Sequence, residues 1–120
     1  MTVETLVVDD SALQRTIVSE ALDDRFEVVA EAENGKDAVR TFAEHRPELV
    51  TMDIMMPEMN GIEATAAIKD RVPEVTIVMV TSVEQREKMK EAVKAGADGY
   101  VTKPIEEETL RSQLVGVLDL

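Results

Sequence analysis

The stretch TLVVDDSALQR, residues 5–15, holds the pattern that decides the fold. The apolar run Leu6 to Val8 is followed at once by two aspartates, then by Ser11 and, three residues on, by Gln14. This is the order of a buried strand, a turn and a helix that Ser11 caps. Two neighbouring carboxylates repel each other unless water, hydrogen bonds or a cation compensates them, so the pair caps the helix or binds a ligand.

Length and composition indicate a single domain. A chain of 120 residues with a hydrophobic content of 44% can build one core, so we expect one domain over residues 1–120. The absence of cysteine excludes disulfides and thiolate metal sites. No apolar run is long enough to span a bilayer, and the N-terminal residues lack the pattern of a signal peptide. The sequence therefore favours a cytoplasmic protein.

The charge balance bears on the class of partner. The chain carries 13 basic and 25 acidic residues, a net charge of -12. Because phosphate backbones are bound mainly through lysine and arginine, this excess disfavours nucleic acid and favours cations and basic partners. It also fits a salty cytoplasm, in which screening weakens the self-repulsion of an acidic surface.

Strand and helix patterns alternate along the whole chain, without a linker or repeat. Strict alternation implies a parallel sheet with right-handed crossovers and helices on both faces. The strands are expected at residues 5–8, 26–32, 49–53, 75–80 and 100–102. The helices are expected after residue 11, at 35–44 and 61–70, after residue 82, and from about residue 106.

Capping signals and apolar spacing refine these helices. Asn60 with Glu63, and Ser82 with Gln85, have the spacing of capping boxes, and Gly96 suits the left-handed position after the fourth helix. Apolar stripes predict which helical side chains face the core. They are Leu13, Ile17, Val18, Ala21 and Leu22 in the first helix, Ala38, Val39 and Phe42 in the second, Met89, Ala92 and Val93 in the fourth, and Leu110, Leu114, Val117 and Leu118 in the fifth.

Polar side chains stand at the carboxyl ends of four of the expected strands. Asp9 and Asp10 follow the first strand, Asp53 ends the third, Thr81 follows the fourth and Lys103 follows the fifth. Open parallel sheets bind ligands outside these ends, where the strand order reverses. Three carboxylates, a hydroxyl and an ammonium group in one crevice predict a hard-cation site beside an anion site.

These residues lie in short motifs whose order and spacing resemble a known signature. VVDDSA, TMDIMMPEMNG, VTS and AGADGYVTKP are similar to the motifs of response-regulator receiver domains, over essentially the whole chain. Among receivers, the chain most resembles the single-domain chemotaxis receivers of the CheY family. The resemblance implies a flavodoxin-like (βα)5 fold, a doubly wound parallel sheet with strand order 2-1-3-4-5. It also implies a phosphoacceptor and not a turnover enzyme.

The resemblance assigns the acidic residues to phosphorylation and metal binding. Asp53 matches the phosphoacceptor, which takes a phosphoryl group from a histidine kinase. Asp10 and Asp53 match direct Mg²⁺ ligands, Asp9 matches a ligand that acts through water, and Met55 matches the position whose backbone carbonyl completes the shell. A cation there would neutralise charge during phosphoryl transfer and compensate the repulsion of the aspartate pair.

The resemblance also assigns the switch residues. Thr81 matches the hydroxyl that hydrogen-bonds the acyl phosphate, Lys103 the cation that pairs with it, and Tyr100 the aromatic that rotates. Met55 and Val83, two positions after Asp53 and Thr81, match side chains that flank the acyl phosphate and set its lifetime. Both are apolar here, which predicts slow hydrolysis because neither can orient the attacking water.

The expected partners follow from the same resemblance. They are a CheA-like histidine kinase, a flagellar or archaellar motor protein or an adaptor protein, and a phosphatase that ends the signal. We expect a monomer that binds neither nucleic acid nor membrane.

Other interpretations stay open at this point. A Mg²⁺-dependent aspartyl phosphatase also forms an aspartyl phosphate on an α/β scaffold, although its usual Asp-x-Asp motif differs from the adjacent aspartates here. The chain can also be the receiver part of a longer regulator, such as a methylesterase or a transcription factor. Taken singly, Asp10 suits a helix N-terminus and Lys103 an exposed loop. His45 is expected in the last turn of the second helix, where it suits the dipole and lies away from the acidic cluster.

Overall fold

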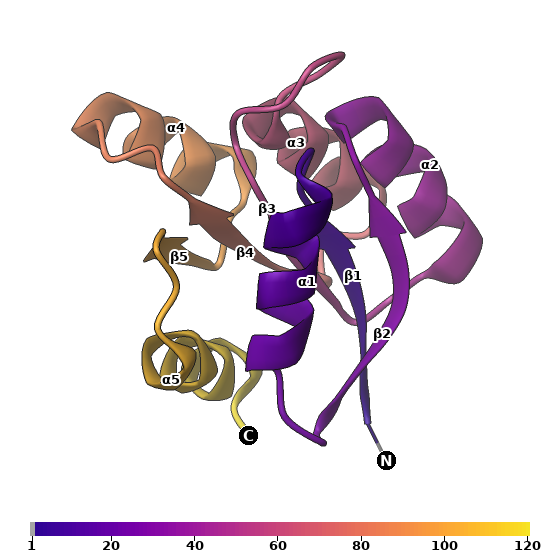
Figure 1. Cartoon of the computed structure of the whole chain (residues 1–120). Coiled ribbons are helices and arrows are strands. Elements are labelled where there is room, and N and C mark those ends of the chain that lie inside the picture. Colours follow the sequence, from indigo (N-terminus) through magenta and orange to yellow (C-terminus); the bar gives the residue numbers. More distant parts are fainter. Residues whose placement is uncertain (1) are drawn as a thin grey trace.

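The computed structural model describes residues 2–120, in which five strands and five helices alternate (Figure 1). The strands are β1 (Val3–Val8), β2 (Phe26–Ala32), β3 (Leu49–Met52), β4 (Thr76–Thr81) and β5 (Gly99–Thr102). The helices are α1 (Ala12–Ala21), α2 (Gly35–His45), α3 (Gly61–Arg71), α4 (Arg86–Ala95) and α5 (Glu107–Leu118). None of the helices in this part of the chain is long and apolar enough to cross a bilayer.

The five strands form one parallel sheet in the order β2-β1-β3-β4-β5. This confirms the expected doubly wound, flavodoxin-like fold. Helices α2, α3 and α4 pack on one face of the sheet, and α1 and α5 pack on the other (Figure 1). The central strand β3 and its neighbour β1 bring their carboxyl ends side by side, because Val8 pairs with Met52.

Two cores lie on the two faces of the sheet. Side chains alternate along each strand, so Leu6 and Val8 of β1 enter the core beneath α2, α3 and α4, whereas Val7 enters the core beneath α1 and α5. Strand β4 alternates in the same way and is buried at its last five positions. Burial on both faces explains why these strands are near-continuous apolar runs.

Most of the helix caps predicted from the sequence are present in the structure. Asn60 accepts hydrogen bonds from the backbone N–H groups of Ile62 and Glu63, and Glu63 accepts one from the Asn60 N–H, which completes the capping box. Ser11 caps α1 through the Gln14 N–H at 3.3 Å. Gly96 ends α4 with φ of 115°, a left-handed conformation in which glycine has no Cβ to clash.

The predicted start of α4 is wrong. The helix begins at Arg86, its N-cap is Gln85 without a side-chain hydrogen bond, and Ser82 is exposed in the preceding loop. Contacts between residues distant in the sequence explain why the helix begins later than predicted. The Tyr100 hydroxyl donates to the Val83 carbonyl at 2.6 Å, and the Thr81 hydroxyl accepts from the Val83 N–H at 3.3 Å. A helix that began at Val83 would need this carbonyl for its own first turn.

Part of the predicted apolar stripe of α1 is also wrong. Leu13 is 68% exposed and Ile17 is 39% exposed, whereas Val18 and Ala21 are buried. Ile17 lines the cavity at the carboxyl edge of the sheet, and Leu13, the second residue of the helix, is exposed to solvent. Val93 of α4, expected to face the core, is likewise exposed.

Several strand ends differ by one or two residues from those expected. Strand β1 begins at Val3, β4 runs over Thr76–Thr81, and β5 begins at Gly99. Asp53 follows β3 instead of ending it. Met52 and Met79 are fully buried, whereas Met89, expected to face the core, is half-buried. None of these shifts moves a candidate residue away from the carboxyl edge of the sheet.

Candidate functional site

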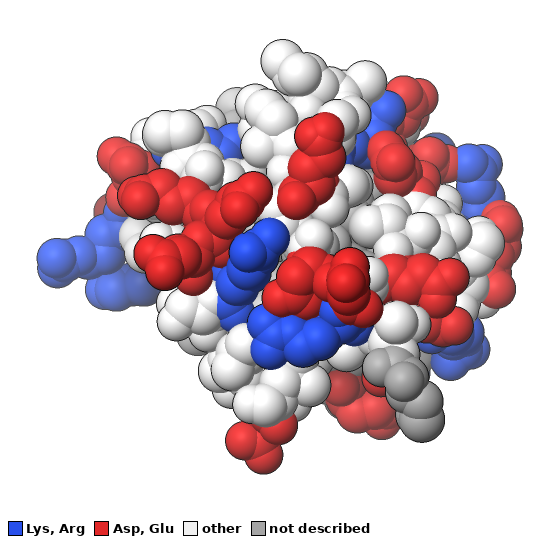
Figure 2. Space-filling view, turned by 60° about the horizontal axis from the view of Figure 1, so that its bottom comes forward, with Lys and Arg blue, Asp and Glu red and all other residues white. Residues whose placement is uncertain are grey.

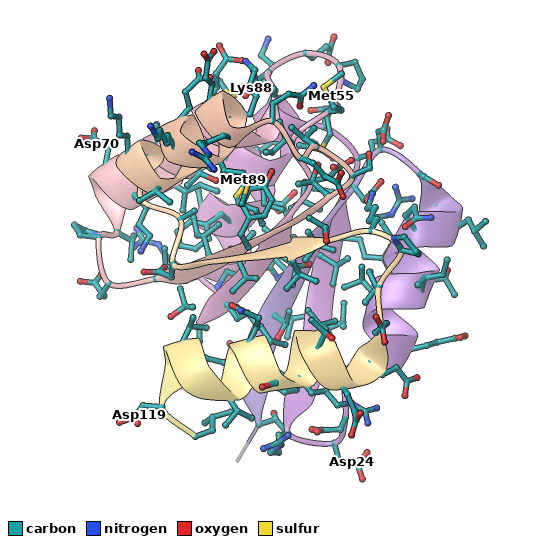
Figure 3. All side chains as sticks on the ribbon, turned by 90° about the vertical axis from the view of Figure 1, so that its left-hand side faces the viewer. Asp24, Met55, Asp70, Lys88, Met89 and Asp119 are labelled. Carbon is teal, nitrogen blue, oxygen red and sulfur yellow. The ribbon has the colours of Figure 1, made fainter. Side chains whose placement is uncertain are left out.

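A cavity of about 710 Å³ opens at the carboxyl edge of the sheet. Asp9, Asp10, Asp53 and Lys103 line it, together with Met55 from the loop after β3. Figure 3 shows Met55 at one end of the molecule and Asp24 and Asp119 at the other. The structure therefore brings together residues from positions 9 to 103, as the alternation of strands and helices predicted.

Three aspartates form a cluster that fits a divalent cation. One carboxylate oxygen from each of Asp9, Asp10 and Asp53 lies within 4.8 Å of the others. Asp9 and Asp53 are buried, whereas Asp10 is exposed. Hard divalent cations prefer carboxylate and carbonyl oxygens, so this donor set fits such an ion. The cluster is thus consistent with a site for a divalent metal.

Lys103 links two of these aspartates. Its Nζ donates to Asp9 Oδ2 at 2.7 Å and lies 3.5 Å from Asp53 Oδ2. The Lys103 side chain is only 14% exposed. Its backbone N–H donates to the Thr81 carbonyl at 2.9 Å, which places the start of the loop after β5 beside the end of β4. The ammonium group is therefore held between the carboxylates by the fold.

The environment of Asp53 disfavours its ionised form. Burial raises the pKa of this carboxyl above its usual value, and the charge of Asp9 raises it further. The Lys103 ammonium, the Thr81 hydroxyl and the Ile54 N–H act in the opposite direction. The Ile54 N–H donates to Asp53 Oδ1 at 2.8 Å. A cation beside the carboxylate would relieve the cost of ionising it.

Gly61 lets helix α3 approach the backbone of Asp53. A Cβ at position 61 would lie 1.9 Å from the Asp53 carbonyl oxygen, closer than any side chain tolerates. The Gly61 N–H donates to the Ile54 carbonyl at 2.9 Å. Gly35 plays a related part, because its N–H donates to the Met59 carbonyl at 3.0 Å. These contacts fix the loop that carries Met55.

Thr81, Val83 and Tyr100 form a second group behind the aspartates. Thr81 is fully buried, and Tyr100 is half-buried against the core beneath α2, α3 and α4. Burial raises the pKa of the Tyr100 hydroxyl, and the charges of Asp53 and Glu84 raise it further. The hydroxyl therefore stays protonated and donates to the Val83 carbonyl.

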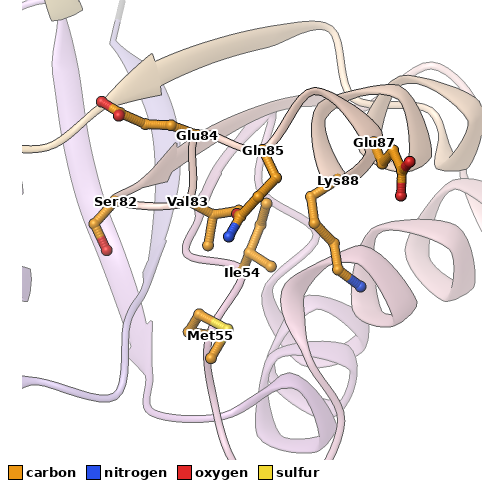
Figure 4. A pocket seen from close by; sticks show the side chains of 8 residues that line it. All are labelled: Ile54, Met55, Ser82, Val83, Glu84, Gln85, Glu87 and Lys88. Carbon is orange, nitrogen blue, oxygen red and sulfur yellow. The ribbon is translucent and has the colours of Figure 1, made fainter.

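A second hollow of about 710 Å³ lies next to the acidic cavity. Figure 4 shows it between the loop after β3, with Ile54 and Met55, and the start of α4, with Lys88. Met55 lines both hollows and its side chain is exposed. Val83 also lines this hollow and is half-buried. The structure thus places Met55 at the boundary of the two hollows, whereas Val83 lines only the second one.

Two further residues, His45 and Arg15, were respectively predicted and missed from the sequence. His45 is exposed at the last residue of α2, as expected. Arg15 was missed by the sequence interpretation, although it donates to the Asp9 carbonyl. A basic residue one turn into the helix behind an acidic pair is the signal that could have identified it.

Residues 5–115 match the response regulator receiver domain family. The chain belongs to this family. Over 118 residues it is 48% identical to the chemotaxis protein CheY of Halobacterium salinarum, covering 98% of both chains. Over 102 residues it is 45% identical to CheY of Bacillus subtilis, covering 84% of this chain and 85% of that one.

A solved structure supports the same assignment. The response regulator domain of Thermotoga maritima CheB superimposes with a TM-score of 0.91 at 30% identity, over 100% of this chain and 98% of that one. The resemblance to receiver domains is therefore confirmed. A receiver is a phosphoacceptor and not a turnover enzyme, so the aspartyl phosphatase alternative is wrong.

Proposed function

We propose that this receiver accepts a phosphoryl group on Asp53 from a histidine kinase and thereby controls a chemotaxis response. One observation carries the proposal: the buried Asp53 carboxylate lies 3.5 Å from the Lys103 ammonium and shares a cation site with Asp9 and Asp10. The similarity to two proteins named CheY supports the chemotaxis assignment. The donor would be a CheA-like kinase, and the target a flagellar or archaellar motor protein or an adaptor.

Asp53 would supply the nucleophile. Its carboxylate oxygen forms the bond to phosphorus while the P–N bond of the donor phosphohistidine breaks, and the released imidazole takes its proton from solvent. The Lys103 ammonium lies close enough to pair with the phosphoryl oxygens. Mg²⁺ would be held by Asp10, Asp53 and the Met55 carbonyl, and by Asp9 through water, and it would supply further neutralisation of charge.

Phosphorylation would be transmitted through Thr81 and Tyr100. A phosphoryl group on Asp53 would offer the Thr81 hydroxyl a doubly charged hydrogen-bond acceptor, which is stronger than a neutral one. Tyr100 is tied to the same segment through the Val83 carbonyl. Movement of Thr81 toward the phosphoryl group therefore shifts the packing of Tyr100 and changes the surface formed by α4, β5 and α5.

The remaining expectations concern the whole molecule. We infer a single receiver domain that acts as a cytoplasmic monomer. Acidic side chains are scattered over the face in Figure 2, among basic and uncharged ones. The net charge of -12 favours basic partner surfaces and disfavours nucleic acid. The apolar side chains of Met55, which lines the acidic cavity, and Val83, which lines the neighbouring hollow, favour a long-lived phosphoprotein. A separate phosphatase or a reverse transfer would then end the signal.

The experiment that tests this function is phosphorylation with acetyl phosphate, followed by intact mass. The wild type should gain one phosphoryl group in Mg²⁺ and none in EDTA, and Asp53→Asn should gain none. Asp24→Asn, an exposed aspartate at the other end of the molecule, is the matched control and should be labelled like the wild type. Full labelling of Asp53→Asn, or labelling undiminished by EDTA, would refute the proposal.

The partner is tested separately. A pull-down that compares beryllofluoride-activated and untreated protein should recover the target preferentially with the activated form. Equal recovery from both forms would contradict a phosphorylation-controlled target.

A further inference from the structure

Arg15 joins three elements at the edge of the acidic site. From α1, its Nη1 donates to the backbone carbonyl of Asp9 at 2.7 Å, and its Nε donates to Glu31 Oε1 of β2 at 2.8 Å. The Arg15 side chain is 16% exposed, while that of Glu31 is 48% exposed. A planar guanidinium held through two of its nitrogens has one orientation. Arg15 is therefore a fixed donor to the end of β1.

The other polar groups of Asp9 also have protein partners. Its N–H donates to the Ala32 carbonyl at 3.1 Å, and its carboxylate accepts from the Ser11 N–H at 3.0 Å and from Lys103 Nζ at 2.7 Å. The bond from Arg15 to the carbonyl completes this set. Asp9 is thereby fixed at its backbone and at both carboxylate oxygens.

The orientation of the Asp9 carbonyl determines the direction of the backbone at Asp10. The peptide bond is planar, so the Asp9 C=O and the N–Cα bond of Asp10 lie in one plane. A donor that fixes the direction of this carbonyl also fixes the direction in which the chain leaves for Asp10. The Asp10 side chain itself is exposed, so its placement depends on that backbone.

We propose that Arg15 is a positioning residue for the cation site, which orients Asp10 through the Asp9–Asp10 peptide plane while Glu31 holds the guanidinium in place. The proposal rests on the proposed function in one respect, the use of Asp10 as a ligand for Mg²⁺. It assigns to α1 and β2 a part in metal binding, although neither supplies a ligand.

Charge and positioning predict opposite effects of removing Arg15. Arg15 is a cation beside a cation site, so if it acted only through its charge, Arg15→Met would relieve repulsion and tighten Mg²⁺ binding. If it positions Asp10, the same substitution weakens Mg²⁺ binding. Loss of a group that orients a metal ligand typically weakens metal affinity by 10-fold or more, and we expect about a 10-fold loss here.

The test is a calorimetric titration of the unphosphorylated protein with Mg²⁺. Arg15→Met should bind about 10-fold more weakly than the wild type. Arg15→Lys keeps the charge but cannot span both partners, so it should also bind more weakly. Arg71→Met removes the same charge from the far end of α3, on the opposite edge of the sheet, and should bind like the wild type. Thermal unfolding in EDTA checks that each variant is folded.

A spectroscopic readout separates positioning from general loss of stability. In the absence of Mg²⁺, Arg15→Met should shift the backbone amide signals of Asp10 and Ser11, and Glu31→Gln should shift them in the same direction by less. Since Arg15→Lys and Glu31→Gln keep the helix packing, they decide the matter if Arg15→Met does not fold.

The outcomes distinguish this proposal from the proposed function. Unchanged or tighter Mg²⁺ binding by Arg15→Met, with normal Mg²⁺ binding by the wild type, would overturn the role of Arg15 alone. Absence of Mg²⁺ binding by the wild type would overturn both proposals. If Arg15→Met does not fold, unchanged Mg²⁺ affinity in both Arg15→Lys and Glu31→Gln would overturn the role of Arg15.

Discussion

Replacing Asp53 by asparagine should stabilise the protein in the absence of Mg²⁺. The carboxylate oxygens of Asp9 and Asp53 lie at most 4.8 Å apart. At that separation and an effective dielectric constant of about 20, two negative charges repel by about 3.5 kcal/mol. Lys103, at 3.5 Å, attracts the Asp53 carboxylate by about 4.7 kcal/mol. These two terms offset each other to within about 1.2 kcal/mol. The burial of the carboxylate, the largest influence on its pKa, therefore decides the sign.

The raised pKa of Asp53 agrees with that sign, because it shows that the folded protein disfavours the ionised form. We therefore expect Asp53→Asn to increase the free energy of unfolding by roughly 1–3 kcal/mol at neutral pH, as for removal of an incompletely compensated buried charge. For a domain of this size, this corresponds to a rise in melting temperature of roughly 3–15 °C.

The pH dependence gives an independent check. Asp53 has a higher pKa folded than unfolded, so the native state binds the extra proton. The stability of the wild type relative to Asp53→Asn should be greatest below the unfolded value of 3.8 and should fall as pH rises through the folded pKa. Above that pKa the difference between the two proteins should become constant.

The assay is urea unfolding of both proteins in EDTA across this pH range, repeated with saturating Mg²⁺. Mg²⁺ should stabilise the wild type by about 2.7 kcal/mol at a concentration 100 times its Kd, and stabilise Asp53→Asn much less. The exposed Asp24→Asn should lie within about 0.5 kcal/mol of the wild type. An Asp53→Asn variant no more stable than the wild type in EDTA would refute the reasoning.

Three further predictions concern the loops and the switch. Met55→Asn should accelerate decay of the phosphoprotein after the phosphodonor is removed, because a polar group can orient water there; an unchanged decay rate, or a wild type that decays within seconds, would contradict it. Beryllofluoride should shift NMR signals along residues 84–118, and changes confined to the surroundings of Asp53 would exclude transmission through Tyr100. Gly61→Ala should destabilise the fold by roughly 1–3 kcal/mol or more and weaken Mg²⁺ binding, because its Cβ would displace the Asp53 carbonyl; a crystal structure with Asp53 unmoved would show otherwise.

Features decided by neighbouring residues could be predicted from the sequence. The capping box at Asn60 and the left-handed Gly96 depend on a few adjacent residues, and both are present. The convergence of Asp9, Asp53 and Lys103 follows from strand alternation alone, whereas the strand order was implied by family resemblance. A parallel sheet places its carboxyl ends together whatever the details of the loops.

Features that depend on residues distant in the sequence could not be predicted in this way. The sequence around Ser82 has a good helix start, but Tyr100, 17 residues beyond Val83, takes the Val83 carbonyl. Leu13 and Ile17 have helical spacing, but the spacing does not reveal that Ile17 lines an open cavity and that Leu13 is exposed to solvent. In each case a tertiary contact or its absence overrode a correct local pattern.

The sheet separates the two cores, so a side chain that rotates in one core changes the packing of that core and not of the other. Val83, Met56 and Tyr100 all pack against the core beneath α2, α3 and α4, whereas Ile105, just after Lys103, packs against the other core. Because protein interiors are close-packed, a rotation of Tyr100 changes the space that side chains of the first core have to fill. We therefore expect the core beneath α2, α3 and α4, and not the core beneath α1 and α5, to absorb this change in volume.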